Sequence, residues 1–382
     1  MKWFGRKAGP RARPFLVAGL GSLFAGEPWP RSYEAQVREA YLGNPVAQRA
    51  VRLVAESVAS VPVYSLTGEE ARPGPRPSPG NEGGRAVSLI PPALLETVAT
   101  QLLLHGNAFV QLLQDGEGMP AELFALRPER VTVEAGPDGW PAAYRYKVGE
   151  AASRIAAVDA LGRPGLAHLK AAHPLDDHYG LGCLGAAAGA VAVHNAAAKW
   201  NKALLDNGAR PSGALVYEDG RGDMLSAEQF ERLRAELEAE HEGARNAGRP
   251  MLLDGGLKWQ AMSLTPADMD FAGLKAAAAR EIALAFGVPP MLIGLPGDST
   301  YANYKEANRA LWRLTVLPMA ERILRGLADA LACWWPGLRL AVDLDRISAL
   351  AEEREALWRQ VIAADFLSRE EKREMLGFES QA

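Results

Sequence analysis

The sequence predicts an α+β fold, because two kinds of hydrophobic periodicity occupy separate parts of the chain. Residues 44–61, 92–105 and 184–207 carry apolar side chains at helical spacing. Residues 108–169 instead hold short alternating runs (AFVQLLQ, ELFALRP, RVTVEA and AAYRYKV) separated by turn sequences such as DGEG and GPDG. A strand-rich stretch set apart from long helices is typical of α+β proteins.

The composition limits the class of protein. The 382 residues suffice for two or three domains, and 48% hydrophobic with 23% charged residues is typical of a soluble globular protein. The net charge of −4 gives no overall basic character that would indicate bulk binding of nucleic acid. Two cysteines, Cys183 and Cys333, exclude a disulfide framework and a cysteine-rich zinc module.

Residues 1–32 predict a flexible basic arm. Basic residues precede the apolar run FLVAGLGSLFAG, an order that loosely resembles a signal peptide. Glycines interrupt that run and no small-x-small cleavage site follows, so an arm is favoured over an export signal. The longest later run without Asp, Glu, Lys or Arg, residues 179–198, is mostly Ala and Gly and too weakly apolar for a membrane span. The basic residues of the arm are Lys2, Arg6, Lys7, Arg11 and Arg13.

The first helices have clear boundaries. Asn44-Pro45 predicts a helix start, since Asn is a good N-cap and Pro suits the first turn. Residues 68–85 are rich in Pro and Gly and predict a loop or a disordered insertion. A second helix is expected from Pro92 to His105.

A long helix is expected after the strands, ending at about Asn207, and a small β-α-β unit at residues 212–264 follows it. Much of one face of the long helix is Ala or Gly, which lets a neighbouring helix approach closely. In the β-α-β unit, the helix beginning at Ser226 has an acidic exposed face, which is either solvated or a docking surface for a basic partner. The small residues of the long helix are Gly185, Ala186, Ala187, Gly189, Ala190 and Ala192.

The last third of the chain predicts two helices around a long loop. A helix starts at Thr265-Pro266 and ends at Phe286-Gly287, and the loop VPPMLIGLPGDSTYAN follows. Ordered loops of this length are usually functional. The next helix places Tyr304, Ala307, Leu311 and Leu314 in phase, and Pro318 should kink it. The strand LRLAVDL and two charged helical segments end the chain.

The segment HPLDDHYG crowds metal-ligand and acid–base residue types into a short stretch: His173, Asp176, Asp177 and His178. A closed zinc site needs four ligands and usually a second, distant pair, which is missing here. Aspartates that bond their own turn are therefore favoured, and a metal-dependent hydrolase built on these four residues is the alternative. The chain has no GxxxxGK[ST], HExxH, GxSxG or strand-linked GxGxxG motif, and GLPGDST lacks the lysine of a phosphate-binding loop.

Four segments resemble the portal proteins of tailed double-stranded DNA phages, of the type shared by long-tailed phages and gene transfer agents. They are LLLHGNAFVQLL, HPLDDHYGLGCLGAA, DNGARPSGALV and FGVPPMLIGLPGDSTYANYKEA. The similarity extends from about residue 33 to about 376, and FGVPP…TYAN is its most specific part. One departure is Gly182-Cys183, where the family more often has Ser-Pro.

The resemblance implies a ring, typically of twelve subunits, at one capsid vertex of a virion that assembles in the host cytoplasm. DNA passes through the ring without sequence specificity during packaging and ejection. Implied partners are the terminase large subunit, the head–tail adaptor or connector and the major capsid protein, with no membrane. The family has no catalytic residue, cofactor or metal site of its own, so no enzyme activity is expected. A head–tail adaptor is a third interpretation, but adaptors are usually much shorter and lack a two-helix stem.

The resemblance also implies a portal-protein fold with an α/β wing, a two-helix stem, a small clip and a C-terminal crown. Its parts are an arm (1–32), wing (33–180), first stem helix (181–211), clip (212–264), second stem helix (265–287), tunnel loop (288–302), kinked wing helix and strand (303–345) and crown-like helices (346–382).

The residues expected to act in this portal-protein fold fall into three groups. The tunnel loop contributes polar side chains, the stem contributes sparse basic ones, and the clip contributes acidic ones. A sparse basic lining suits sliding DNA, because each neutralised phosphate adds affinity. The groups are Gly297, Asp298, Ser299, Thr300, Tyr301 and Asn303 for the loop; Lys199, Lys202, Arg210, Lys275 and Arg280 for the stem; and Glu231, Glu236, Glu238 and Glu240 for the clip.

Overall fold

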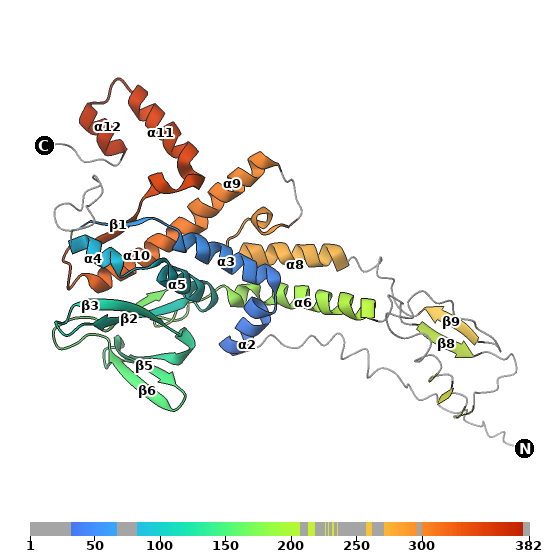
Figure 1. The fold of residues 1–382 in the computed structure, drawn as a ribbon. Coiled ribbons are helices and arrows are strands. Elements are labelled where there is room, and N and C mark those ends of the chain that lie inside the picture. The colour runs from blue at the N-terminus through green and yellow to red at the C-terminus, as the bar shows by residue number, and fades with distance from the viewer. Residues whose placement is uncertain are drawn as a thin grey trace, which may run out of the picture.

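The structure, a computed structural model, confirms the predicted α+β class (Figure 1). It describes residues 32–66, 82–206, 213–217, 257–261, 271–295 and 300–376, with residues 226, 228, 231, 232 and 235. Residues 1–31 of the predicted arm and most of the predicted β-α-β helix lie outside the described residues. No helix in the described part combines the length and the apolar character that a membrane span requires.

A helical core forms the centre of the molecule, where α3 (Pro45–Ala59), α5 (Pro92–Leu104) and α10 (Leu317–Leu331) pack on one another. The Oδ1 atom of Asn44 accepts hydrogen bonds from the first two free N–H groups of α3, at 3.0 Å each, so the predicted cap is confirmed. In the described part of the chain, two short helices precede α3: α2 (Tyr33–Val37) and the π-helix η1 (Arg38–Leu42).

The loop predicted at residues 68–85 extends too far toward the C-terminus, because helix α4 (Glu82–Ser88) begins inside it. Ala86 of this helix is fully buried in the hydrophobic core, and α4 packs against strand β1 (Val63–Leu66). The Gly-rich sequence EGGRAVS has a weak helix propensity, so tertiary burial decides its conformation.

The strands form two antiparallel sheets rather than one meander. Strands β2 (Asn107–Gln114), β3 (Pro120–Leu126) and β7 (Leu166–Lys170) give the order β3-β2-β7. After the 3₁₀ turn η3 (Pro128–Arg130), the second sheet has the order β4-β5-β6. The chain returns from it to pair β7 with β2, with Phe109 opposite His168. The strands of the second sheet are β4 (Val131–Ala135), β5 (Pro141–Val148) and β6 (Ala151–Ala156).

The long helix predicted after residue 302 is interrupted ahead of Pro318. It runs as α9 (Tyr301–Leu311), the π-helix η6 (Trp312–Val316) and α10. Pro318 has no N–H to offer to the carbonyl of Leu314, and the π-helical turn occurs next to this gap. Because a π-helix turns the chain less per residue, Leu314 leaves the phase of buried Leu311 and is 77% exposed. The predicted phase is therefore wrong at Leu314. The predicted strand LRLAVDL is present as β10 (Arg339–Val342), paired with β1.

The C-terminal helices stand off the body (Figure 1). They follow two 3₁₀ turns, η7 (Leu344–Arg346) and η8 (Ser348–Leu350), and comprise α11 (Ala351–Ala363) and α12 (Arg369–Met375). Only Val361 of α11 is buried. Ion pairs connect α11 to α9 and η6: Lys305–Glu352 at 2.5 Å, Arg309–Glu352 at 3.3 Å and Arg313–Glu353 at 3.3 Å.

Two long helices, α6 (Leu184–Asp206) and α8 (Phe271–Ala285), lie side by side and project from the body (Figure 1). The antiparallel strands β8 (Gly213–Tyr217) and β9 (Leu257–Ala261) lie beyond their far ends. The predicted strand GALVYE is present as β8. The predicted helix start at Thr265 lies outside the described residues.

Candidate functional site

The chain reaches α6 through a close crossing of two backbone segments, residues 104–106 and 180–182. A Cβ atom on Gly180 would lie 2.1 Å from the carbonyl oxygen of Gly106, and one on Gly182 would lie 2.4 Å from that of Leu104. Gly106 has a φ of +81°, and its Cβ would lie 2.3 Å from the carbonyl carbon of Leu181. Only glycine fits at these three positions, because any side chain would separate the two segments.

Asn107, at the start of β2, is hydrogen-bonded to both backbone segments of this crossing and is only 1% exposed. Its Oδ1 accepts hydrogen bonds from the N–H of Gly180 (2.7 Å) and from Nε2 of His168 (3.0 Å). Its Nδ2 donates to the carbonyls of Gly180 (3.1 Å) and His105 (3.3 Å). A single buried amide therefore fixes the segment that leads into α6.

A second polar cluster holds α6 further along its length. Nδ2 of Asn44 donates to Oδ1 of Asn195 (2.8 Å) and lies 3.1 Å from Nδ1 of the buried His194. Nδ2 of Asn195 donates to the carboxylate of Glu39 (2.8 Å). Burial lowers the pKa of His194, and the Lys275 ammonium on α8 adds to this effect. The helix α6 is thus attached to the body at two places.

The segment HPLDDHYG forms a hydrogen-bonded turn. Oδ1 of Asp176 accepts hydrogen bonds from the N–H groups of His178 (2.7 Å) and Tyr179 (2.9 Å). These backbone donors hold the pKa of the Asp176 carboxyl below its usual range. Nδ1 of His173 accepts the N–H of Leu175 (3.1 Å), and Lys170 donates to the carbonyl of Asp177. The expected self-bonded turn is confirmed for Asp176.

Nothing in the described structure supports the metal-dependent hydrolase. Across the described residues, no group of three or more His, Cys, Asp or Glu side chains is arranged to hold a metal ion. Nδ1 of His173 and Oδ1 of Asp176 instead accept hydrogen bonds from the backbone of the turn.

The helix pair presents two different faces. Of the small residues predicted on α6, Ala187 and Ala190 are buried, while Gly185, Ala186, Gly189 and Ala192 are exposed. A Cβ atom added to Gly185 or Gly189 would meet nothing within 4 Å. This strip of small residues, the open α6 face, is therefore uncovered in the single subunit.

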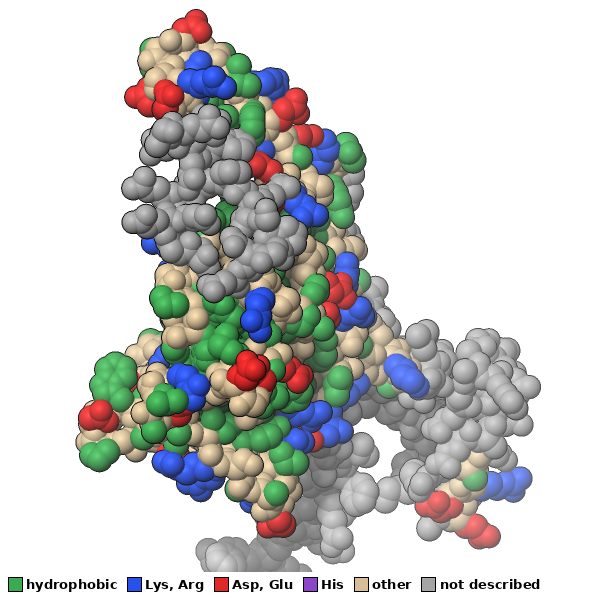
Figure 2. Space-filling view, turned by 60° about the vertical axis from the view of Figure 1, so that its left-hand side comes forward, with side chains coloured by type: hydrophobic (Ala, Val, Ile, Leu, Met, Phe, Trp, Pro, Cys, Tyr) green, Lys and Arg blue, Asp and Glu red, His purple; other side chains and the backbone are tan. Residues whose placement is uncertain are grey.

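The predicted basic residues of the helix pair lie in different surroundings. Lys199 and Lys202 on α6 and Arg280 on α8 are exposed, while Lys275 is half-buried beside His194. Arg210 lies outside the described residues. On the face that Figure 2 shows, charged side chains of both signs are scattered among hydrophobic ones, and no extended basic patch forms.

The structure describes three of the six predicted tunnel-loop residues, and these form the start of helix α9. The hydroxyl of Thr300 accepts the N–H of Asn303 (3.2 Å) and caps α9. Tyr301 and Asn303 were expected in the loop, but they lie in the first turn of α9 because this cap starts the helix early. The sixteen-residue loop is also shortened by the 3₁₀ turn η5 (Pro290–Ile293). Gly297, Asp298 and Ser299 lie outside the described residues.

Only one of the four predicted clip residues lies in the described part of the chain. Glu231 is exposed, and Glu236, Glu238 and Glu240 lie outside the described residues. The choice between a solvated face and a docking surface stays a prediction.

Comparison with known proteins identifies the family, since residues 45–377 match the phage portal protein family. The chain belongs to the phage portal protein family. It is 42% identical to an uncharacterized protein of Rickettsia felis over 89% of this chain and 88% of that one. It is 30% identical to the probable portal protein of Streptomyces phage phiC31, over 72% of this chain and 61% of that one.

Solved portal-like structures share the fold. A chain from the neck of a native gene transfer agent particle, computed with C12 symmetry, is 47% identical with a TM-score of 0.68, covering 94% of this chain and 98% of that one. An HK97-family portal protein from Corynebacterium diphtheriae has a TM-score of 0.55 at 18% identity, covering 81% and 97%. The predicted family is therefore confirmed, and portal proteins are structural proteins rather than enzymes.

The sequence interpretation missed Asn107 and the reason for the three glycines. In the sequence, Gly106-Asn107 indicates only the end of the helix expected at residues 92–105. The partners of Asn107 lie 61 and 73 residues away, so no local pattern indicates them. The one available signal is a polar residue at the head of the apolar run AFVQLL, because a buried polar group needs partners.

We expect Asn107→Leu to destabilise the subunit by roughly 3–5 kcal/mol, since it leaves the buried donors of Gly180 and His168 without acceptors. Urea unfolding measures the free energy, and hydrogen exchange should show faster opening of residues 171–183. Gln114→Leu, at the exposed end of the same strand, is the matched control and should change stability little. Equal effects of the two substitutions would contradict the role of Asn107.

His168 should make stability depend on pH. Burial lowers its pKa to about 4, and the positive charges of Lys170, His105 and His178 act in the same direction. The unfolded chain takes up this proton near pH 6.5 and the folded chain only near pH 4. Stability is therefore complete above about pH 6.5 and falls by up to about 3 kcal/mol as the pH drops toward 4. His168→Gln keeps a side-chain N–H for Asn107 and should remove the loss of stability between pH 6.5 and pH 4. Urea unfolding at several pH values measures this. If the unfolding free energy depends on pH as it does in the native chain, other groups cause the loss.

Proposed function

We propose that this chain is the subunit of a ring at one capsid vertex, through which DNA enters and leaves the particle. The observation that carries the proposal is the 47% identity, over nearly the whole chain, to the neck subunit of a gene transfer agent particle computed with C12 symmetry. The matching chain of the native virion has the same identity and covers 96% of this chain.

The helix pair supports a stem in such a ring. Two long helices project from the body, and the open α6 face carries residues small enough for a neighbouring subunit to pack closely. In this assignment residues 33–180 are the wing, 181–211 and 265–287 the stem, and 212–264 the clip. Residues 303–345 complete the wing, and 346–382 form the crown.

The electrostatics support passage of DNA rather than tight binding. The basic residues Lys199, Lys202 and Arg280 are exposed but sparse, and each phosphate that such residues neutralise adds affinity. The polar residues Gly297, Asp298 and Ser299 would face DNA as the tunnel loop, just ahead of the Thr300 cap. The terminase large subunit and the head–tail adaptor would dock on the clip, and the major capsid protein would surround the wing.

Deletion of residues 297–299 tests the channel assignment while it leaves the Thr300 cap in place. We expect rings to form normally and packaged DNA to fall several-fold, because the loop would no longer reach the channel axis. The control is an equally long deletion of residues 77–79, which the assignment places away from the channel. Normal DNA content in particles with intact rings would contradict the tunnel-loop role.

A further inference from the structure

Three basic side chains follow one another along one face of α9 and η6: Lys305, Arg309 and Arg313. Residues four apart on a helix are surface neighbours, about 6 Å apart along the axis. The row, named here the α9 basic stripe, therefore spans about 12 Å, a length over which one strand of B-DNA carries about three phosphates. Guanidinium and ammonium groups in such a row suit a phosphate backbone.

Two carboxylates in the first turn of α11 cover the α9 basic stripe. Glu352 lies 2.5 Å from Nζ of Lys305 and 3.3 Å from Nη2 of Arg309. Glu353 lies 3.4 Å from Nε of Arg309 and 3.3 Å from Nη1 of Arg313. Carboxylate and phosphate oxygens accept the same charge-assisted hydrogen bonds. The carboxylates of α11 therefore occupy the places that phosphate groups would take.

The cover is held weakly. The side chains of Lys305, Glu352 and Arg313 are 43%, 61% and 61% exposed, and exposed ion pairs contribute little net stability. Helix α11 buries only Val361, which is not part of the main core cluster. It joins the body through η8, where Leu350 is buried in that cluster. Movement of α11 about η8 therefore leaves the core intact.

The cover decides the net charge of this surface. Glu306 lies on the same helix as the stripe, 3.0 Å from Nη1 of Arg309, and stays there when α11 moves. The uncovered stripe thus has three positive charges and one negative charge, a net charge of +2. The carboxylates of Glu352 and Glu353 bring this sum to zero. Displacement of α11 therefore changes a neutral surface into a basic one.

The stripe continues the surface assigned to the channel. Tyr301 is the first residue of α9, directly after the Thr300 cap, and its side chain is 77% exposed. Nζ of Lys305 lies 5.2 Å from the centroid of the Tyr301 ring. DNA that passes the proposed tunnel loop therefore meets the stripe next along α9.

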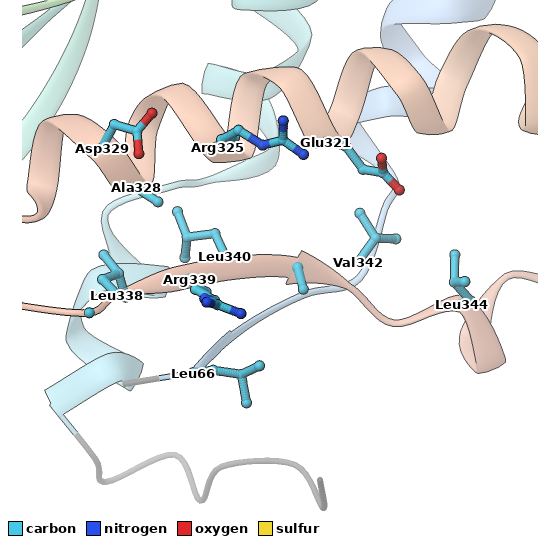
Figure 3. Close-up of a pocket in the computed structure, with 12 residues that line it drawn as sticks. Leu66, Glu321, Arg325, Ala328, Asp329, Leu338, Arg339, Leu340, Val342 and Leu344 are labelled. Atoms are coloured by element: carbon cyan, nitrogen blue, oxygen red, sulfur yellow. The ribbon is translucent and has the colours of Figure 1, made fainter. Parts of the chain in front are cut away.

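The cavity of about 610 Å³ between α10 and β10 offers no comparable site (Figure 3). Its charged lining residues are Glu321 and Asp329 against Arg325 and Arg339, so positive and negative charges balance. A polyanion gains no net attraction there, and the α9 basic stripe is the better candidate.

We propose that the α9 basic stripe is a binding site for the phosphate backbone of double-stranded DNA, and that Glu352 and Glu353 cover this site in the free subunit. The covered stripe adds no phosphate contact, so DNA slides past it. The uncovered stripe adds phosphate contacts and holds the DNA, because each neutralised phosphate adds affinity. The class of ligand rests on the proposed channel function, whereas the cover follows from the ion pairs alone.

DNA binding by the purified full chain tests the proposal, with a short fluorescent duplex of arbitrary sequence as the probe. We expect the cover variant, Glu352→Gln/Glu353→Gln, to bind the duplex roughly tenfold more tightly than the native chain, with a salt dependence steeper by about two. Glu355→Gln/Glu370→Gln is the matched control, because it removes the same charge from exposed positions that do not pair with the stripe. Equal affinities of the two variants would overturn the proposal.

Removal of the stripe makes the test specific. Lys305→Gln/Arg309→Gln/Arg313→Gln, added to the cover variant, should return the affinity to that of the native chain. An equal loss of charge elsewhere on the body should keep most of the tenfold gain. If both triple substitutions abolish the gain, overall charge and not the stripe accounts for it, and the proposal fails. The control substitutions are Arg38→Gln/Arg52→Gln/Arg145→Gln, at exposed residues that pair elsewhere.

Two further outcomes are decisive. Tighter binding of the cover variant to polyglutamate than to the duplex would assign the stripe to an acidic protein and contradict DNA as the ligand. Native mass spectrometry of the same variants separates this site from the channel function. Rings without the gain in affinity contradict only the stripe, and the gain without rings supports the stripe while it contradicts the channel.

Discussion

Gly106→Ala is expected to cost roughly 3–5 kcal/mol of folding free energy, enough to leave much of the protein unfolded. Two penalties combine at this position. A left-handed backbone, here at a φ of +81°, costs an alanine about 1–2 kcal/mol. The new Cβ would also lie 2.3 Å from the carbonyl carbon of Leu181, so the crossing must open and the bonds of Asn107 to Gly180 must lengthen. Urea unfolding of the purified chain measures the loss.

Gly139→Ala separates the two penalties. Gly139 has nearly the same φ, +83°, but a Cβ there meets nothing within 4 Å. It should lose only the backbone part, about 1–2 kcal/mol. If both substitutions cost the same, the close crossing contributes nothing and the account of the three glycines is wrong.

Gly185→Leu/Gly189→Leu is expected to leave the subunit folded but to abolish the ring. Both Cβ positions are open in the single subunit, and leucine favours a helix over glycine by up to about 1 kcal/mol per site. The subunit should therefore melt no earlier than the native chain. In the ring, two leucines on the open α6 face would hold the neighbouring subunit away, so assembly should fail. Thermal unfolding and native mass spectrometry measure the two effects separately.

Gly116→Leu is the matched control, because Gly116 also has no neighbour within 4 Å of a Cβ but lies in the β2–β3 turn. It should assemble like the native chain. Rings formed normally by the double variant would show that the open α6 face is not a subunit contact.

Much of the secondary structure follows from local patterns. The Asn44 cap, the strands at 108–148 and the helix α6 are all present where the periodicity and capping residues predict them. The self-bonded turn at Asp176 is also predictable, because an aspartate bonds N–H groups two and three residues ahead of it.

Long-range contacts explain the rest. Helix α4 forms in a Gly-rich sequence because Ala86 is buried by distant segments. The π-helical turn at 312–316 shifts the phase of Leu314, and no apolar spacing indicates it. Asn107 becomes the centre of the crossing through partners on β7 and in the turn before α6. The resemblance identified the family correctly because its motifs are specific.

The central claim is that this chain forms a closed ring, and native mass spectrometry of the purified chain measures this most directly. We predict a single assembly of twelve subunits, with microscopy showing a central channel. A protein that stays strictly monomeric at assembly concentrations, even with the capsid protein present, would contradict the account.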